Sequence, residues 1–157
     1  MPSVVIRVAS QAGTRPPCSG KSAVPEIGVL PVQMTELGAE SIFLDGLPEI
    51  IHALQWHGAE VTRLPEGAKV LATSPDCAVQ AMSWGPRALS MQFHVEVETD
   101  TVANWAAIPE YKAALEAAFG EGGAKRLAAD CVARIEDMNL VAERIYINWL
   151  QAAAQVG

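Results

Sequence analysis

The sequence predicts a layered α/β domain, because a strand-rich half is followed by a helix-rich half. Turn residues recur every eight to ten positions between residues 60 and 94, as they do in a series of short strands. After residue 99 the apolar residues adopt a helical period, which continues nearly to the C-terminus. A chain of 157 residues that is 50% hydrophobic is sufficient for one core, so we expect one domain.

The strands are predicted as follows. Residues 26–36 carry alternating apolar side chains and form the first strand, with Pro31 at an edge or a bend. Residues 37–58 mix short helical turns with loop, and Asp45-Gly46 marks a turn. The next four strands are short and separated by turns, which predicts an antiparallel meander; they span residues 60–64, 69–74, 77–84 and 87–94.

Three helices are predicted in the C-terminal half. Thr99 and Asp100 are favourable N-cap residues for the first helix. The second helix spans residues 109–119, with a proline in its first turn and Gly120 at its end. The third begins at Gly123 and runs for about nine turns. One apolar stripe with spacings of three and four is expected to pack this helix on the sheet: Leu127, Cys131, Ile135, Met138, Ala142, Ile145 and Trp149.

Composition limits the function classes. The net charge of −7 disfavours nucleic-acid binding, because an acidic chain repels phosphate groups. No apolar run approaches the roughly 18 residues of a membrane span. The three cysteines are widely spaced and form no Cys-x-x-Cys pair, which argues against disulfides and for a reduced, cytoplasmic protein. There is no P-loop, and we expect no cofactor.

The N-terminal segment differs from the rest of the chain. Residues 1–25 contain three cations and no acid, whereas all 18 acidic residues follow them. A glycine and two prolines within this segment would break the amphipathic helix of an organelle transit peptide. We therefore predict an atypical segment over residues 1–19 and a folded domain over residues 20–157.

His94 and Glu96 are the strongest candidate catalytic residues. Residues two apart on a strand share a face, so the carboxylate can hold the imidazole in the tautomer that a general base needs. An ordinary histidine and an exposed glutamate at a strand end remain an alternative reading. A metal site that also includes His52 and His57 is a further alternative. It is disfavoured, because these histidines are predicted in an irregular segment without a recognisable second shell. No metal site is expected.

The segment Gln-Phe-His-Val-Glu at residues 92–96, together with the sequence before it, resembles the class I glutamine amidotransferases. The other pieces that resemble the family are His57-Gly58, Val61 to Leu64, Gly67, Val70 to Ser74 and residues 26–32. The resemblance covers about residues 20–100 well and the C-terminal helices loosely. It departs from the family at Val95, where proline is usual.

The resemblance implies a flavodoxin-like layered sheet with flanking helices and a Cys-His-Glu triad. In that triad His94 would be the general base and later the acid, and Glu96 would orient it. His57 and the backbone near Gly58 and Ala59 would help bind glutamine. The complete domain would hydrolyse glutamine to glutamate and ammonia, and would pass the ammonia to an acceptor such as a separate synthetase.

The nucleophile of such a triad is not recognisable in this sequence. The family presents it in a Gly-x-Cys-x-Gly-x-Gln type of motif, which is absent. Cys18 has a glycine two positions later, but serine replaces the glutamine, and two prolines precede the cysteine. Cys77, predicted in a meander strand, and Cys131, on the helical stripe, are interpreted as small apolar residues.

We therefore expect an N-terminally incomplete glutamine amidotransferase domain that is inactive in this form. One explanation is a truncated or frame-disrupted gene product, whose first residues come from another reading frame. The alternative is a genuine short relative that serves as a non-catalytic binding or regulatory module on the same scaffold.

Overall fold

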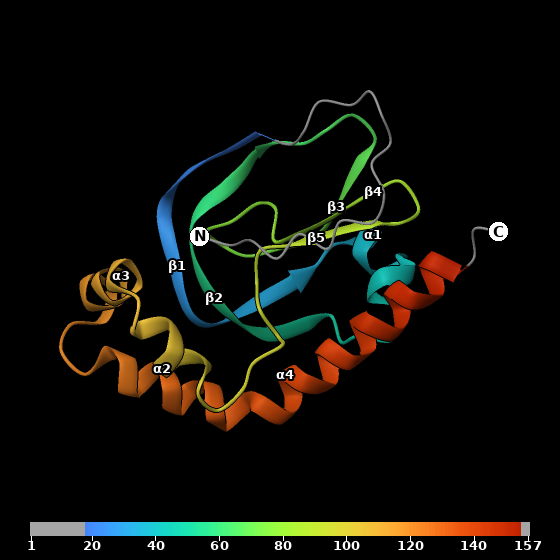
Figure 1. The fold of residues 1–157 in the computed structure, drawn as a ribbon. Helices are drawn as coiled ribbons and strands as arrows, with labels where there is room; N and C mark the ends of the chain where they lie inside the picture. Colours follow the sequence, from blue (N-terminus) through green and yellow to red (C-terminus); the bar gives the residue numbers. More distant parts are fainter. Residues whose placement is uncertain (1–17, 155–157) are drawn as a thin grey trace.

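The computed structural model describes residues 18–154, so the atypical segment predicted over residues 1–19 lies almost wholly outside the described range. The protein is a mixed α/β domain, as predicted (Figure 1). Its elements are β1 (Cys18–Met34), α1 (Glu36–Ala39), the 3₁₀ helix η1 (Ile42–Leu44), β2 (Ile50–Arg63), β3 (Ala68–Thr73), β4 (Ala81–Trp84), β5 (Ala88–Met91), α2 (Thr101–Ala106), α3 (Pro109–Phe119) and α4 (Gly123–Ala154).

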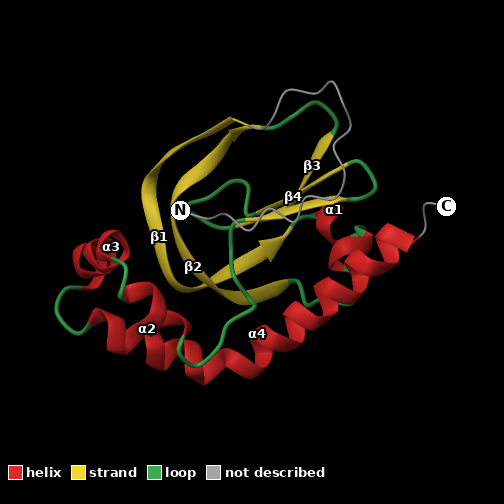
Figure 2. Ribbon diagram, viewed as in Figure 1, coloured by secondary structure: helices red, strands yellow, loops and turns green. Residues whose placement is uncertain are grey.

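The sheet has five antiparallel strands in the order β2-β1-β3-β4-β5. The β3, β4 and β5 strands form a meander, as predicted. The strand predicted over residues 60–64 as the first of that meander belongs instead to β2, which pairs with β1 and not with β3. The long β1–β2 ribbon curls away from them (Figure 2) and joins them only where Gln33 and Met34 pair with β3. Because β1 has one strand neighbour at Pro31, this proline lies at an edge, as predicted.

Other strand bounds also differ from the prediction. Residues 50–58, predicted as turns and loop, belong to β2. Every residue from Ala53 to His57 is buried, so this part of the strand lacks the alternation that identifies a half-exposed strand. The strand predicted over 77–84 is shorter, because residues 77–80 form bends that precede β4.

The helices lie close to their predicted positions. The α3 helix begins at Pro109 and is followed by Gly120, whose φ of 68° suits a residue without a Cβ atom. The α4 helix runs along the outer side of the curled ribbon, below β1 and β2 in Figure 1, and all seven residues of its predicted stripe are buried or half-buried against the core. Asn148 adds two hydrogen bonds from its buried amide to the carbonyl oxygens of Phe43 and Asp45, at 3.2 and 2.8 Å.

The α1 helix is held tightly against β3. Thr35 caps it by accepting a hydrogen bond from the backbone N–H of Gly38, and donates its hydroxyl to the carbonyl oxygen of Val70. A Cβ atom at Gly38 would lie 2.0 Å from the carbonyl oxygen of Leu71, so only glycine allows this approach.

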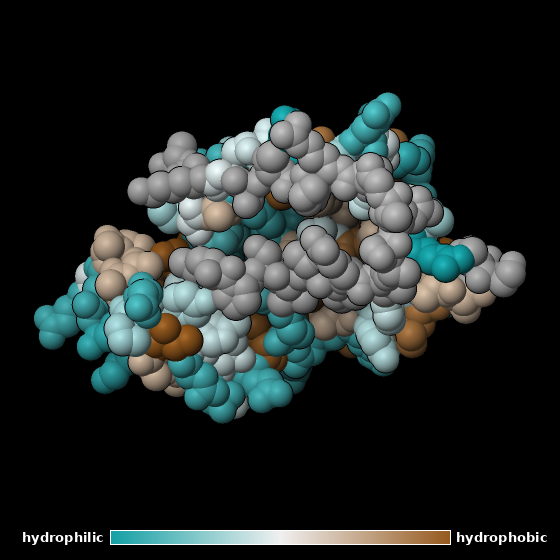
Figure 3. All heavy atoms as spheres, turned by 45° about the horizontal axis from the view of Figure 1, so that its top comes forward, coloured by the Kyte–Doolittle hydropathy of each residue, from teal (hydrophilic) through white to brown (hydrophobic). Residues whose placement is uncertain are grey.

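The described surface mixes apolar and polar residues. In Figure 3 hydrophobic residues lie near both ends of the molecule, among hydrophilic ones. Leu140 and Tyr146 remain exposed on the outer face of α4. Within residues 18–154, no helix combines the length and apolarity that crossing a bilayer requires.

Candidate functional site

His94 is fixed to the β1–β2 ribbon through its backbone. The strand predicted to end at this residue ends at Met91, and His94 instead forms an isolated antiparallel bridge with Leu54 of β2. The two residues exchange backbone hydrogen bonds with N···O distances of 2.8 and 2.9 Å. The bridge fixes the backbone from which the imidazole projects.

The side chains of His94 and Glu96 meet, as the sequence predicted. His94 Nδ1 lies 2.6 Å from Glu96 Oε1. The second carboxylate oxygen, Oε2, accepts the backbone N–H of Val95 at 3.0 Å. Because an ionised carboxylate only accepts hydrogen bonds, Nδ1 carries the proton, and Nε2 of a neutral His94 is left as an acceptor. Val95 contributes a hydrogen bond that proline at this position cannot make.

Glu96 remains ionised in this arrangement. Partial burial would raise the pKa of its carboxyl group, but the hydrogen bonds from His94 and Val95 outweigh burial and hold the pKa below its usual value. The Glu96 side chain is 51% exposed, whereas that of His94 is 9% exposed. The pair therefore lies where the core meets the surface.

Trp105 of α2 packs against the imidazole of His94. Its ring centroid lies 4.9 Å from that of His94 in an edge-to-face arrangement, and it also contacts Trp56 of β2 edge to face at 5.6 Å. The aromatic contact restricts rotation of the imidazole. Sequence reasoning did not find Trp105, because a tryptophan within a short helix has no distinguishing pattern.

His57, Gly58 and Ala59, the predicted glutamine-binding residues, lie next to one another on β2. The His57 side chain points to the opposite side of the ribbon from His94. Leu54 shares a side with its bridge partner His94, and His57 is an odd number of positions further along the strand. His57 therefore does not share a face with His94 and Glu96, and instead contacts a separate set of residues. Its role in substrate binding stays a prediction.

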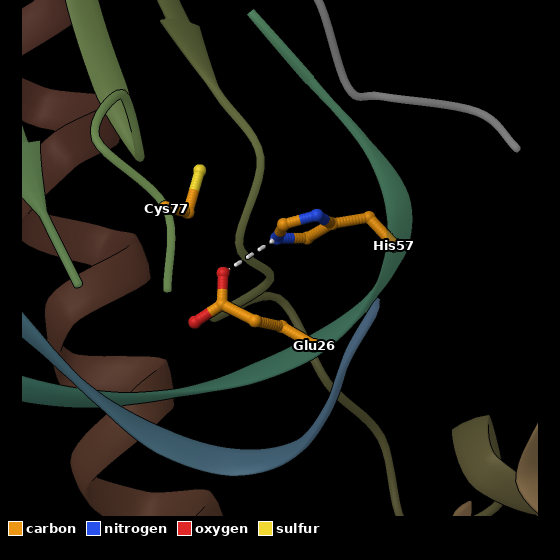
Figure 4. Close-up of side chains that lie close together, drawn as sticks. All are labelled: Glu26, His57 and Cys77. Carbon is orange, nitrogen blue, oxygen red and sulfur yellow. Dashed lines mark ion pairs between the residues drawn. The ribbon is translucent and has the colours of Figure 1, made fainter. Parts of the chain in front are cut away.

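The partners of His57 form a second polar group inside the protein (Figure 4). Its Nε2 atom lies 3.4 Å from Oε2 of Glu26 and 3.1 Å from Oε1 of Gln55, and its Nδ1 lies 3.1 Å from the carbonyl oxygen of Ala59. Burial lowers the pKa of His57 more than the nearby Glu26 and the Ala59 carbonyl raise it. Cys77 completes the group, with donor atoms of the three side chains Glu26, His57 and Cys77 within 4.8 Å of one another.

Sequence reasoning missed this group. Cys77 is buried as expected, but it lies in the bends before β4 and not in a strand. Its sulfur accepts a hydrogen bond from Nε2 of Gln92 at 3.0 Å. A glutamate at position 26, followed by apolar strand residues, was an available signal of a buried partner.

The metal alternative with His52 and His57 was disfavoured because both were predicted in an irregular segment, and that segment assignment was wrong. Both residues lie on the regular part of β2 at an odd separation, so their side chains point to opposite faces. One metal site cannot use both.

Among the described side chains, no hydrogen bond joins His94 to Cys77 or Cys131. Cys18 begins β1 opposite Arg63, nine positions along β2 from Leu54, which is roughly 30 Å of strand. It therefore does not lie on the strand-to-helix turn that presents a nucleophile. Cys131 is buried on α4 as predicted, and burial raises the pKa of its thiol to about 11.

A cavity of about 620 Å³ lies elsewhere, beside α1. Its lining includes Leu37, Phe43 and Leu71, and Ala152 from the end of α4, but neither His94 nor Glu96. The hydrogen-bonded pair and this cavity are therefore separate features of the molecule.

Comparison with known proteins identifies relatives of this chain. The family model described as glutamine amidotransferase class-I matches residues 24–104, just over half of the chain. A GMP synthase [glutamine-hydrolyzing] of Lactococcus lactis is 42% identical over 73 residues, which are 46% of this chain and 14% of the relative. A GMP synthase of Aeropyrum pernix is 35% identical over 91 residues, 55% of this chain and 17% of the relative.

Two solved glutamine amidotransferase structures share the fold. The structure from Methylobacillus flagellatus has a TM-score of 0.70 at 23% identity, over 85% of this chain and 55% of its own. That from Thermotoga maritima has a TM-score of 0.69 at 23% identity, over 82% of this chain and 53% of its own. The chain thus spans about half the length of these proteins, and about one seventh of the length of the Lactococcus relative.

Proposed function

The chain belongs to the class I glutamine amidotransferase family, and from this premise we propose that the chemistry of a complete domain of this kind is release of the amide nitrogen of glutamine as ammonia. The observation that carries the proposal is the 2.6 Å contact between His94 Nδ1 and Glu96 Oε1, because it leaves Nε2 free to take a proton.

The proposed reaction uses His94 as base and then as acid. Nε2 takes the proton of a cysteine thiol, and the resulting thiolate attacks the side-chain amide carbon of glutamine. The same proton passes to the departing nitrogen, which leaves as ammonia, and a thioester remains. Water, deprotonated by Nε2, then hydrolyses the thioester to glutamate. Glu96 stabilises the imidazolium that forms in each half-reaction.

The proposed binding residues are His57, Gly58 and Ala59. Among the described residues other than its chain neighbours, only Pro25 has an atom within 4 Å of the position that a Cβ atom would take at Gly58, so the backbone there is open to a ligand. The relatives are named for glutamine hydrolysis and GMP synthesis. We propose that ammonia from the complete domain likewise passes to a synthetase on a separate chain.

The 157-residue chain by itself is proposed to release no ammonia, since it has no Gly-x-Cys-x-Gly-x-Gln type of motif. The test is ammonia release from glutamine by the purified chain, with His52→Ala as a matched control for His94→Ala. The expected result is no release above that of either variant. Release that is abolished by His94→Ala and by Cys18→Ser, but not by His52→Ala, would establish Cys18 as the nucleophile.

A non-catalytic binding or regulatory module is the second candidate. It is favoured by the surroundings of Cys77 and Cys131, neither of which forms a hydrogen bond with His94 among the described side chains. A chain of this kind would bind glutamine without turnover, and glutamine would raise its Tm through binding to the folded state. The test compares the Tm with and without glutamine, with glutamate as the control ligand. A retained glutamine pocket predicts a higher Tm with glutamine, and an absent pocket predicts no change.

A further inference from the structure

Glu26, His57 and Cys77 converge from three separate segments of the chain (Figure 4). Glu26 on β1 and His57 on β2 are directly opposed cross-strand partners, so their side chains project from the same face. Cys77 approaches from the bends between β3 and β4, where its backbone and that of Ser74 exchange hydrogen bonds. All three side chains are at least nine-tenths buried.

The hydrogen-bond acceptors in this group exceed the available protons. A neutral histidine carries one N–H, but Nδ1 of His57 faces the carbonyl oxygen of Ala59 and Nε2 faces Oε1 of Gln55. If Nδ1–H donates to Ala59, the lone pair of Nε2 points toward two oxygens, those of Gln55 and Glu26. Nε2 of Gln55 is also buried without a partner. Three electron-rich atoms that face one another in the interior are unfavourable unless a proton, an amide N–H or a metal cation lies between them.

We propose that Glu26, His57 and Cys77 form a binding site for a divalent, sulfur-tolerant metal ion of the zinc class. Zinc accepts this combination of carboxylate, imidazole and thiolate ligands. In tetrahedral coordination with ordinary bond lengths, its nitrogen and oxygen ligands lie about 3.4 Å apart. The distance from His57 Nε2 to Glu26 Oε2 is 3.4 Å.

Charge and protons balance in this site. Binding releases the thiol proton of Cys77 to solvent as the sulfur–metal bond forms. A divalent cation with one thiolate, one carboxylate and a neutral imidazole has no net charge, which suits a buried position.

Surrounding groups orient each proposed ligand. The carbonyl of Ala59 fixes the His57 tautomer, as carbonyl groups commonly do behind metal-bound histidines. Ser74 and Gln80 each donate to the Glu26 carboxylate at 2.7 Å, and Gln92 donates to the sulfur of Cys77. Oε1 of Gln55 or a water molecule supplies the fourth ligand. The bound ion would clamp β1, β2 and the β3–β4 connection together, a structural role independent of the proposed glutaminase chemistry.

Two arrangements without metal would also relieve the acceptor excess. His57 can take a second proton and pair with Glu26 as an imidazolium, or the Gln55 amide can rotate so that its nitrogen donates to Nε2. Both predict that the purified chain binds no metal at this position, so metal analysis separates them from the proposal.

The test uses the full chain, made without a polyhistidine tag in zinc-supplemented medium. The expected result is about one zinc per chain by mass spectrometry of the metal. In the cobalt-substituted protein, thiolate-to-cobalt charge-transfer absorption is expected, and it should disappear in Cys77→Ser and decrease in His57→Gln. The matched controls Cys131→Ser, Cys18→Ser and His52→Gln should retain metal and absorption.

Zinc should also stabilise the fold. At free zinc 100-fold above its Kd, the Tm should rise by roughly 5–10 °C over the chelator-treated chain, and this rise should be lost in Cys77→Ser. If Cys77→Ser does not fold by circular dichroism, zinc-edge X-ray absorption of the wild-type chain replaces it, and one sulfur ligand is expected. Substoichiometric zinc, a coordination shell without sulfur, or absorption that follows Cys18 or Cys131 would overturn the proposal.

Discussion

Replacement of Val95 by proline tests how Glu96 is held. The substitution removes the backbone N–H that donates to Oε2 of Glu96 at 3.0 Å, and leaves the contact between Oε1 and His94 in place. A hydrogen bond to a buried charged group contributes roughly 1.5–3 kcal/mol. Since the Glu96 side chain is 51% exposed, water replaces part of the lost bond, and we expect a loss of about 0.5–1 kcal/mol.

The assay is the pH dependence of the free energy of unfolding. The pKa of Glu96 is held low in the folded protein, so its contribution to stability is present above the pKa of the unfolded chain and is lost as the pH falls through the folded value. In Val95→Pro this pH-dependent part, measured between about pH 7 and pH 3, should shrink by about 0.5–1 kcal/mol. Proline also lowers the conformational entropy of the unfolded chain. This effect does not depend on pH, so it cancels when the unfolding free energies of one variant at two pH values are subtracted.

Val95→Ala is the matched control, because it keeps the N–H. The Val95 side chain is 2% exposed, and loss of two buried methyl groups should lower stability by about 1.6 kcal/mol at every pH. Equal pH profiles for Val95→Pro and the wild-type chain, or an equal change in both variants, would refute the role assigned to the N–H.

Three further predictions concern the fold and the buried polar group. Gly38→Ala should destabilise the chain by about 3 kcal/mol or more in denaturant unfolding, because its Cβ atom would lie 2.0 Å from a carbonyl oxygen, while Gly58→Ala should be nearly neutral; similar losses would contradict the packing of α1. Met138→Ala should cost about 2–5 kcal/mol, since Met138 is fully buried, against about 0.5 kcal/mol or less for the 65% exposed Leu140→Ala; equal costs would contradict the assigned face of α4. The lowered pKa of His57 means that below about pH 6.5 the unfolded chain binds more protons than the folded chain, so the stability of the wild-type chain falls as the pH drops. In the presence of chelator, His57→Gln should make this fall less steep. An unchanged slope of unfolding free energy against pH would contradict the burial of His57.

The sequence predicted correctly those features that depend on residues close together in the chain. Pro109 and Gly120 marked the ends of α3 because proline suits a first helical turn and glycine a positive φ. The stripe on α4 was readable because one face of a long helix is buried and the other is not. The meeting of His94 and Glu96 followed from their separation of two, although the chain leaves the sheet after the bridge at His94.

Tertiary structure decided the features that were missed. The middle of β2 is covered on both faces, so its pattern did not distinguish strand from loop or helix. The pairing of Glu26 with His57 depends on the register of a long ribbon, which local spacing does not specify. Cys77 joins them only because the chain bends before β4, and Trp105 reaches His94 only through the packing of α2. The second polar group was therefore not visible in the sequence.

The tautomer of His94 tests the central claim most directly. Nitrogen-15 NMR of the imidazole side chains, assigned with His94→Gln, reports which ring nitrogen carries the proton near neutral pH. The account predicts a proton on Nδ1 and an unprotonated Nε2, with this preference lost in Glu96→Gln. A neutral His94 that is protonated on Nε2, or a tautomer that does not respond to Glu96→Gln, would contradict it.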